Sequence, residues 1–465
     1  MKKLQKLIAL ILVLFSLLFL FSCNKDKKKQ GHRPGIFEKQ REIRLPYSKQ
    51  DGLNPYFAKS RVNYNLFPLL YESLVTLDQN FATKNVVATN IENKGSFLDV
   101  TVDKKKFSPN DVVYSFNMAK ASPLYAPMLA NVDKATINGN DKVRFSLKSP
   151  MQFAAKTLTF PIVKSRTADK KDMVPQATGM YVISGETLEK NKKSDVKPTT
   201  EKIALYNINE DPALYYAMQV GNIDAYYDPL TKENLKASPT QRTAVSTSNL
   251  VCLMIGPNLT INAAQKKYIS ANIDREKFKN EGYAGHLLAN NLPYPKGMPE
   301  TQKFYAKDVN SNELKEQLGD FTKKQYSLIF CKDNNIKTNS GTVIASQLNN
   351  AGIKIKAEAL TYDEYMSRMK SGRYDFALAE IKLTEDMNLT PVITNKNFKN
   401  IYDSFENGTL PVEQYIKSYY DDPPFIALGH KTGVLVYSRL IKENVSACDV
   451  NVYGNFQNWH IKEIN

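Results

Sequence analysis

The stretch that most constrains the fold of this chain is Lys202–Pro229, which has the pattern of a strand, a helix and a second strand. Its first part is a β-branched and aromatic run of strand type. Asp211 can cap a helix, and Pro212 suits the first helical position because the N–H that proline lacks would be unpaired there. Gly221 can end the helix in a left-handed conformation, and Ile223–Tyr227 follows as a strand. Such a unit belongs to an α/β lobe whose sheet buries both strands.

The N-terminus has the pattern of a targeting segment. Lysines at positions 2, 3 and 6 precede a run of fifteen residues, Leu7 to Phe21, that are apolar except for Ser16; this run is short for a membrane span of about 20 residues. The ending Leu20-Phe21-Ser22-Cys23 resembles a bacterial lipobox, in which Cys23 becomes the lipidated N-terminus after cleavage. An uncleaved anchor and an ordinary secretory signal are the alternatives. We expect residues 1–22 to be a lipoprotein signal peptide, and several acyl chains on Cys23 to hold the protein at the membrane, outside the cytoplasm.

A polar, lysine-rich stretch follows the lipobox. Residues 23–40 cannot bury enough apolar surface to fold, so we expect a flexible tether. Residues 1–49 carry twelve Lys and Arg against three acids, which is nine of the sixteen net positive charges of the protein. A basic tether beside a membrane is expected to meet anionic lipid head groups rather than nucleic acid.

Length and composition indicate a large globular body. The 465 residues suggest about three domains or lobes, and 42% hydrophobic residues supply ample core. Cys252, Cys331 and Cys448 remain beside Cys23, and two of them lie in apolar, strand-like runs. They are expected to be buried small hydrophobes, because no CxxC or Cys/His spacing for a metal is present.

Several helix starts can be predicted from capping residues. Ser108 and Asp111 form a capping box with Pro109 at the first helical position, and Asn262 and Asp274 are also expected to cap helices. Leu66–Leu77 has apolar residues at helical spacing. The third part of the sequence has a β-α-β-α-β order, with strands and helices expected at Tyr326–Cys331, Ser340–Asn350, Ile353–Ala359, Asp363–Lys370 and Tyr374–Ala379.

Motifs spread along the sequence resemble, in order, those of the extracellular solute-binding proteins of family 5, the oligopeptide and dipeptide receptors of ABC importers. The residues that carry the resemblance are Leu53-Asn54-Pro55, Asp111-Val112-Val113-Tyr114-Ser115, Thr178-Gly179-Met180-Tyr181, Met218-Gln219-Val220-Gly221-Asn222-Ile223-Asp224, Ile273-Asp274-Arg275 and Gly372-Arg373-Tyr374-Asp375. Met180 replaces the usual proline of its motif. The sequence is shorter than the family pattern before the Ser108 helix and after Asp386.

The resemblance implies an α/β, two-lobed periplasmic-binding-protein-like fold of class II, with an extra lobe inserted in the first. The expected division, after the signal peptide and tether, is lobe I at 41–60, 156–255 and 431–465, the inserted lobe II at 61–155, and lobe III at 256–430. Ligand would bind where two lobes close, as in other proteins of hinged domains.

Catalytic patterns are sparse, and we expect no enzyme activity, cofactor or metal. The four histidines lie far apart in sequence, and no HExxH, GxSxG or Gly-rich phosphate loop occurs. Ser194-Asp195-Val196-Lys197 and Ser367-Arg368-Met369-Lys370 match the Ser-x-x-Lys pattern but lack its companion motifs.

The candidate ligand residues follow from the resemblance and from the chemistry of a peptide. In the peptide-binding members an Asp of lobe III, shortly after the strand matching Tyr374–Ala379, pairs with the peptide amine. We choose Asp386 as the acid that pairs with the amine, with Glu385 and Glu380 nearby. The alternative is that these three residues are solvated loop acids. The other candidates for the cleft are Asn54, Tyr56, Met180 and Tyr181.

The sequence therefore predicts a lipid-anchored, monomeric receptor that captures peptides and delivers them to the permease subunits of an ABC importer. A receptor of the same fold for nickel, haem, a sugar or an opine is one alternative. A surface lipoprotein acting in adhesion or signalling, without transport, is the other.

Overall fold

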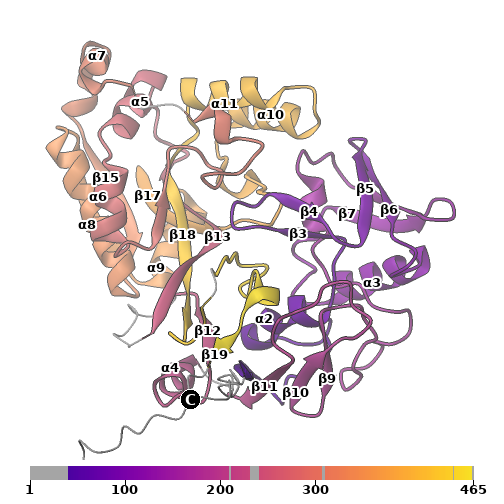
Figure 1. The fold of residues 1–465 in the computed structure, drawn as a ribbon. Coiled ribbons are helices and arrows are strands. Elements are labelled where there is room, and N and C mark those ends of the chain that lie inside the picture. Colours follow the sequence, from indigo (N-terminus) through magenta and orange to yellow (C-terminus); the bar gives the residue numbers. More distant parts are fainter. Residues whose placement is uncertain (1–39, 209–210, 231–239, 306–308, 443–444, 463–465) are drawn as a thin grey trace, which may run out of the picture. The chain divides into compact units, whose positions relative to one another are not determined.

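The computed structural model describes residues 40–462 except 209–210, 231–239, 306–308 and 443–444 (Figure 1). The predicted signal peptide, the lipidated Cys23 and the tether up to residue 39 lie outside the described residues.

A four-stranded sheet brings together distant parts of the sequence. Its order is β2-β11-β10-β9, and β2 and β11 run parallel, with Ile43 opposite Ile203. Helix α2 packs against β2 and β9. The elements of this region are β2 (Ile43–Tyr47), α2 (Arg61–Leu70), β9 (Tyr181–Ser184), β10 (Thr187–Lys190) and β11 (Lys202–Asn207).

A second four-stranded sheet, in the order β5-β6-β8-β7, is antiparallel throughout and carries α3. The hairpin β3–β4 precedes it in the sequence. Its elements are β3 (Val75–Leu77), β4 (Thr83–Asn85), β5 (Ala88–Asn93), β6 (Phe97–Val102), α3 (Pro109–Ala121), β7 (Val132–Ile137), β8 (Lys142–Leu147) and the 3-10 helix η1 (Ala154–Thr157).

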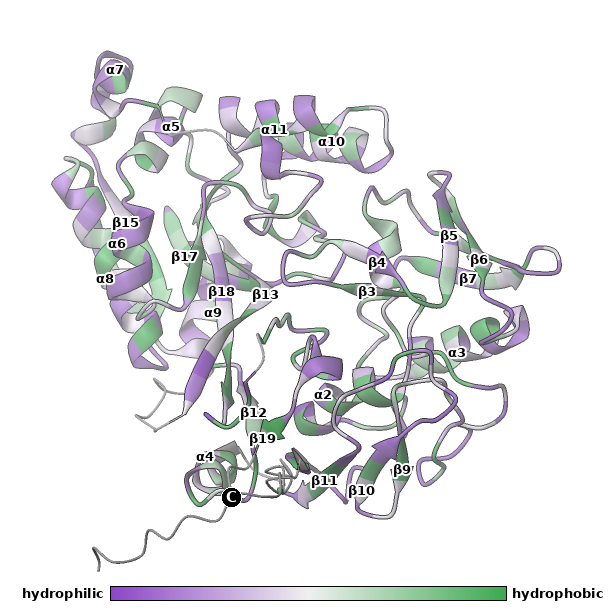
Figure 2. Ribbon diagram, viewed as in Figure 1, coloured by the Kyte–Doolittle hydropathy of each residue, from purple (hydrophilic) through white to green (hydrophobic). Residues whose placement is uncertain are grey.

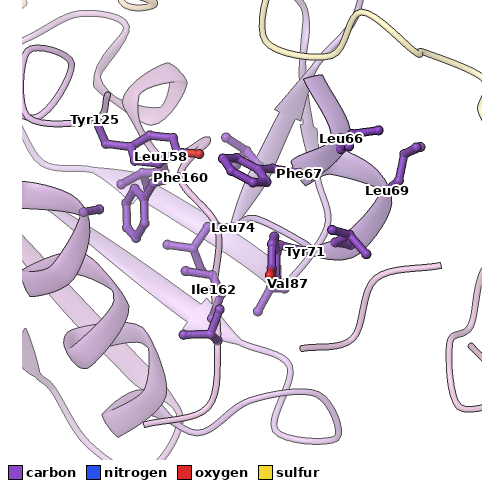
Figure 3. Packing of buried hydrophobic residues seen from close by; sticks show 14 of the residues in the cluster. Leu66, Phe67, Leu69, Tyr71, Leu74, Val87, Tyr125, Leu158, Phe160 and Ile162 are labelled. Carbon is purple, nitrogen blue, oxygen red and sulfur yellow. The ribbon is translucent and has the colours of Figure 1, made fainter. Parts of the chain in front are cut away.

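One continuous hydrophobic cluster underlies both four-stranded sheets. Figure 3 shows Leu66, Phe67 and Tyr71, from the end of α2, in the same cluster as Leu158 and Phe160. Burying such side chains is the main favourable term in folding, at roughly 2 kcal/mol for each large apolar side chain. The cluster therefore fixes the two sheets on one core.

The largest sheet has seven strands, in the order β12-β18-β13-β17-β15-β16, with β14 paired to β18. Strands β13 and β18 are its long central pair, and their register shifts between Val245 and Asn249. The strands are β12 (Ala225–Asp228), β13 (Gln241–Ile255), β14 (Leu287–Ala289), β15 (Gln325–Cys331), β16 (Lys354–Leu360), β17 (Phe376–Lys382) and β18 (Phe425–Tyr437); β1 (Gln40–Arg41) and β19 (Ile461–Lys462) form a separate pair.

Helices α5 to α11 accompany this large sheet. Figure 2 shows both polar and apolar colours along α10 and α11, as expected of helices with one buried face, and Phe398, Tyr402 and Phe405 are the buried residues of α10. The helices are α4 (Asp211–Gln219), α5 (Ala263–Ala271), α6 (Arg275–Lys277), α7 (Ser311–Leu314), α8 (Asn335–Asn350), α9 (Tyr362–Ser371), α10 (Lys396–Glu406) and α11 (Val412–Asp421). Within the described residues, no helix is long and apolar enough to span a membrane.

Three of the capping predictions are confirmed, whereas the cap expected of Asp211 stays a prediction, because residues 209–210 lie outside the described residues. Ser108 and Asp111 form the expected capping box at α3, Asn262 caps α5, and Asp274 accepts a hydrogen bond from the Lys277 N–H at 2.8 Å. Cys252, Cys331 and Cys448 are free and buried, as predicted.

Two local predictions are wrong. The helical spacing of Leu66–Leu77 does not describe one helix: α2 starts earlier, at Arg61, and ends at Leu70, and Val75–Leu77 is strand β3 paired with β4. The strand–helix–strand unit does not lie in one sheet either, because β11 pairs with β2 whereas β12 pairs with β18. Pairing with partners distant in sequence decides both cases, and local periodicity carries no information about such partners.

Candidate functional site

The predicted acids lie on β17 and on the loop that follows it. Buried Leu383, Met387 and Leu389 hold the loop in place. The Met387 N–H donates to the Thr384 carbonyl at 2.9 Å, and the Leu389 N–H donates to the Tyr402 hydroxyl at 2.9 Å. Packing and hydrogen bonds therefore hold the loop between β17 and α10 in one defined conformation.

Asp386 is a buried carboxyl in this loop, with 6% of its surface exposed. Burial raises its pKa to about 6; a hydrogen bond with the Thr384 side chain opposes this rise, and the charge of Glu406 adds to it. Oδ1 of Asp386 has no hydrogen-bond partner among the described residues. An oxygen of this kind is a ready acceptor for a donor that arrives with a ligand.

Glu385 is the neighbouring, partly exposed acid. Burial raises its pKa to about 7. The charge of Lys382 opposes this rise, and the charge of Asp449 adds to it. Burial also raises the pKa of the Tyr64 and Tyr125 phenols, to which the charge of Glu385 adds. The two tyrosine rings lie 6.1 Å apart, so Glu385 lies within electrostatic reach of an aromatic pair.

Glu380, on β17, takes part in an ion pair instead. Lys431 of β18 lies 3.3 Å from Glu380 Oε1 and also donates to the Leu230 carbonyl at 2.9 Å. Glu380 Oε2 is buried without a partner among the described residues. Its position favours a role in joining two strands.

A cavity of about 390 Å³ is lined by residues of α2, of the hairpin β3–β4 and of the stretch that precedes β19. Tyr64, Phe67, Tyr125 and Met180 line part of it, as does the C-terminal stretch Ser446–Cys448. Met180 is therefore the predicted site residue that faces this cavity. Asp386 and Glu385 do not line it, but Glu385 acts on the two tyrosines that do.

Asn54, Tyr56 and Tyr181 are buried, and their polar groups bind backbone groups. Asn54 donates to the carbonyls of Ala168 and Lys170, at 3.1 and 2.8 Å. The hydroxyl of Tyr56 donates to the Pro161 carbonyl at 2.7 Å, and that of Tyr181 to the Thr200 carbonyl at 2.9 Å. The lining residues of the cavity do not include these three side chains. Their assignment as ligand residues stays a prediction.

Other charged residues in the same region were not expected from the sequence. Lys382 pairs with Asp449, whose own N–H donates to Ser246 at 2.9 Å, beside the register shift of β13. Arg61 donates to the Asp449 carbonyl at 2.7 Å and lies 4.9 Å from the rings of both Tyr64 and Tyr227. Asp449 belongs to a segment without helical or strand periodicity, so no sequence pattern indicated these contacts.

The sequence comparison decides the family. Residues 103–390 match the sequence model of the bacterial extracellular solute-binding proteins, family 5, in its middle part. The chain belongs to this family. No curated protein sequence matches it.

Solved structures of other binding proteins have a similar fold over nearly all of this chain. The periplasmic murein tripeptide binding protein MppA, in an unliganded open form, has a TM-score of 0.70 at 14% identity, over 92% of this chain and 99% of that one. NikA from Brucella suis, in complex with Fe(III)-EDTA, has a TM-score of 0.62 at 14% identity, over 90% and 100%. DppA from Helicobacter pylori, in complex with the peptide STSA, has a TM-score of 0.55 at 15% identity, over 91% and 98%.

This family 5 protein therefore has the predicted α/β fold of the periplasmic binding proteins. It is a solute-binding receptor for an ABC importer, in a family of extracytoplasmic transport proteins rather than enzymes.

Proposed function

We propose that this receptor captures peptides and that Asp386 accepts the ammonium group of the peptide. The observation that carries the proposal is the buried, unpaired Oδ1 of Asp386. A buried carboxylate oxygen without a partner is unfavourable, and a hydrogen-bonded ammonium would remove most of that penalty. The raised pKa of about 6 reflects the same unfavourable charge in the ligand-free protein.

The body of the ligand would occupy the cavity lined by Tyr64, Tyr125 and Met180, and its amine would extend beyond that cavity to Asp386, which does not line it. A volume of about 390 Å³ lies within the usual range for small-ligand sites, roughly 300–1,000 Å³. Glu385, beside the aromatic pair, would supply a further acceptor, whereas Glu380, paired with Lys431, would act from the large sheet that supports the site. Asn54, Tyr56 and Tyr181 would act from the core, by holding the loops around the cavity.

The fold does not distinguish a peptide from another ligand. MppA is named for a tripeptide and DppA is in complex with a peptide, whereas NikA is in complex with Fe(III)-EDTA. Among the described residues, no group of three or more His, Cys, Asp or Glu side chains could hold a metal ion. Nickel, haem, sugar and opine receptors, and an adhesion or signalling lipoprotein, are the alternatives that the experiment below separates from a peptide receptor.

The proposal includes a membrane tether and the division into lobes. Lipidation at Cys23 would hold the receptor beside its permease, with residues 23–40 as the spacer, and the protein would act as a monomer. Lobe I would comprise 41–60, 156–255 and 431–465, lobe II 61–155, and lobe III 256–430. The family membership and the Lys-rich sequence after Cys23 support this arrangement.

The test is native mass spectrometry of the protein made without residues 1–23 and purified gently from cells. We expect adducts at peptide masses, reduced about 30-fold or more in Asp386→Asn, because that variant leaves an ammonium without its counter-charge. Asp363→Asn, an exposed acid on α9, is the matched control and should keep the adducts. Adducts that survive Asp386→Asn would refute the anchor, and adducts at non-peptide masses would refute peptide binding.

A further inference from the structure

Residues 151–157, here named the strap, connect the β5–β8 sheet to the core beside the large sheet. The Phe153 ring lies 5.8 Å from that of Tyr294 and 5.7 Å from that of Phe405. Phe153 belongs to the same buried cluster as both residues. The buried ammonium of Lys156 lies 2.8 Å from Glu300. The strap, which crosses the boundary between predicted lobes II and I, therefore contacts predicted lobe III through aromatic side chains and one ion pair.

Glu406, the last residue of α10, contacts the strap directly. Its Oε2 accepts the N–H of Gln152 at 2.9 Å. Burial raises the pKa of Glu406, and hydrogen bonds with Tyr402 and with the Gln152 N–H oppose this rise. Tyr402 in turn accepts the N–H of Leu389, in the loop that carries Asp386. Glu406 is thus linked to the strap on one side and to the Asp386 loop on the other.

In the absence of a ligand, ionisation of both Asp386 and Glu406 is unfavourable. The charge of Glu406 disfavours ionisation of Asp386, and Asp386 has an unpaired oxygen. Lys399, the nearby cation on α10, is bound to Asp403 of the same helix. The two carboxyl groups therefore tend not to be ionised at the same time. A carboxyl group that keeps its proton is a weaker hydrogen-bond acceptor than a carboxylate.

We propose that Glu406 is a positioning residue that couples occupation of the Asp386 amine site to docking of the strap. This inference rests on the proposed function. An ammonium at Asp386 supplies the missing positive charge and favours the ionised form of Glu406. An ionised carboxylate makes a stronger hydrogen bond with the Gln152 N–H than a neutral one. Ligand binding then holds lobe II against lobe III at the strap.

The experiment is amide hydrogen exchange followed by mass spectrometry on the segment 151–157. The probes are a tryptic digest of casein, whose peptides carry free amines, and the same digest after acetylation of its amines. At saturating free-amine digest we expect exchange of the segment to slow by about tenfold, as one strengthened charge-assisted hydrogen bond implies. The acetylated digest should leave the exchange rate unchanged.

The variants are Glu406→Gln, which keeps an acceptor but removes the charge, and Asp363→Asn, which removes an exposed carboxylate from α9 and leaves the Lys399–Asp403 pair intact. We expect the slowing to disappear in Glu406→Gln and to persist in Asp363→Asn, with thermal unfolding confirming that both fold. Equal slowing in Glu406→Gln would overturn the coupling. Binding of the digest without slowing in the wild-type protein would overturn the coupling alone, whereas no binding at all would overturn the peptide proposal and the coupling with it.

Discussion

The carboxylate of Asp224 holds the guanidinium group of Arg44 through two hydrogen bonds, of 3.0 and 3.1 Å. The backbone N–H of Arg44 also donates to the Asp224 carboxylate at 2.8 Å, and the backbone N–H of Asp224 donates to the Arg44 carbonyl at 2.7 Å. The Ser438 N–H, just after β18, donates to the Asp224 carbonyl at 2.8 Å. One buried acid therefore joins β2 of the four-stranded sheet to the end of β18 in the large sheet.

Replacing Asp224 by Asn should lower the free energy of unfolding by about 3 kcal/mol, because two guanidinium groups, those of Arg41 and Arg44, lose their counter-charge in a largely buried site. Urea unfolding followed by circular dichroism measures this change. Asp320→Asn, which breaks an exposed pair with Lys323, is the matched control and should leave the midpoint unchanged. Equal midpoints for the two variants would show that the Asp224 network contributes nothing to stability.

This network also shows where sequence reasoning about the fold stops. Helix starts at Pro109, Ala263 and Arg275 were predictable because a capping residue and the N–H groups that it binds are neighbours in the sequence. Asp224 closes a contact 180 residues away in sequence, and no local pattern encodes such a partner. The assignment of β11 and β12 to different sheets likewise rests on partners distant in sequence, β2 and β18, and could not be predicted.

The same limit applies to the candidate site. Asp386 could be chosen from its position after a predicted strand, and the structure places it in a buried loop with an unpaired oxygen. Glu406 lies twenty residues further on and approaches Asp386 through tertiary contacts, among them the hydrogen bond from the Leu389 N–H to Tyr402 on α10. Tyr56 is an aromatic residue with a polar group, as is common in ligand sites, but its hydroxyl already donates to the Pro161 carbonyl.

Gly179 lies where the motif before β9 passes the end of α2. A Cβ at this position would overlap the backbone carbonyl group of Leu70, which cannot move without displacing the helix end. We expect Gly179→Ala to lower the free energy of unfolding by about 2 kcal/mol. Urea unfolding tests this, with the volume-conserving Met180→Leu as control. A loss below that of the control would mean that the loop relaxes away from α2.

Cys23 lies outside the described residues, and its role is testable in whole cells. If it is lipidated, the full-length protein should incorporate labelled palmitate and partition into the detergent phase of Triton X-114. Cys23→Ser should lose the label, because the acyl groups have no other attachment point. Detergent partitioning by an unlabelled wild-type protein would identify an uncleaved anchor instead.

Asp386 gives the receptor a defined pH dependence. Its folded-state pKa of about 6 lies above the ordinary value for an aspartate, so the folded protein binds more protons than the unfolded protein between about pH 4 and 6. The contribution of Asp386 to stability is therefore lost as the pH rises through this window, by about 3 kcal/mol in total. Asp386→Asn removes this titration.

We therefore expect Asp386→Asn to become progressively more stable relative to the ligand-free wild-type protein from about pH 4 to pH 6, and the difference to level off above that range. Chemical unfolding at several pH values measures the difference, in which the shared titrations cancel. The free-amine casein digest should reverse the trend for the wild-type protein, because an ammonium binds the ionised carboxylate and its affinity rises with pH up to about 6. A difference that is constant with pH would mean that Asp386 titrates as an ordinary exposed aspartate and has no special capacity to bind an amine.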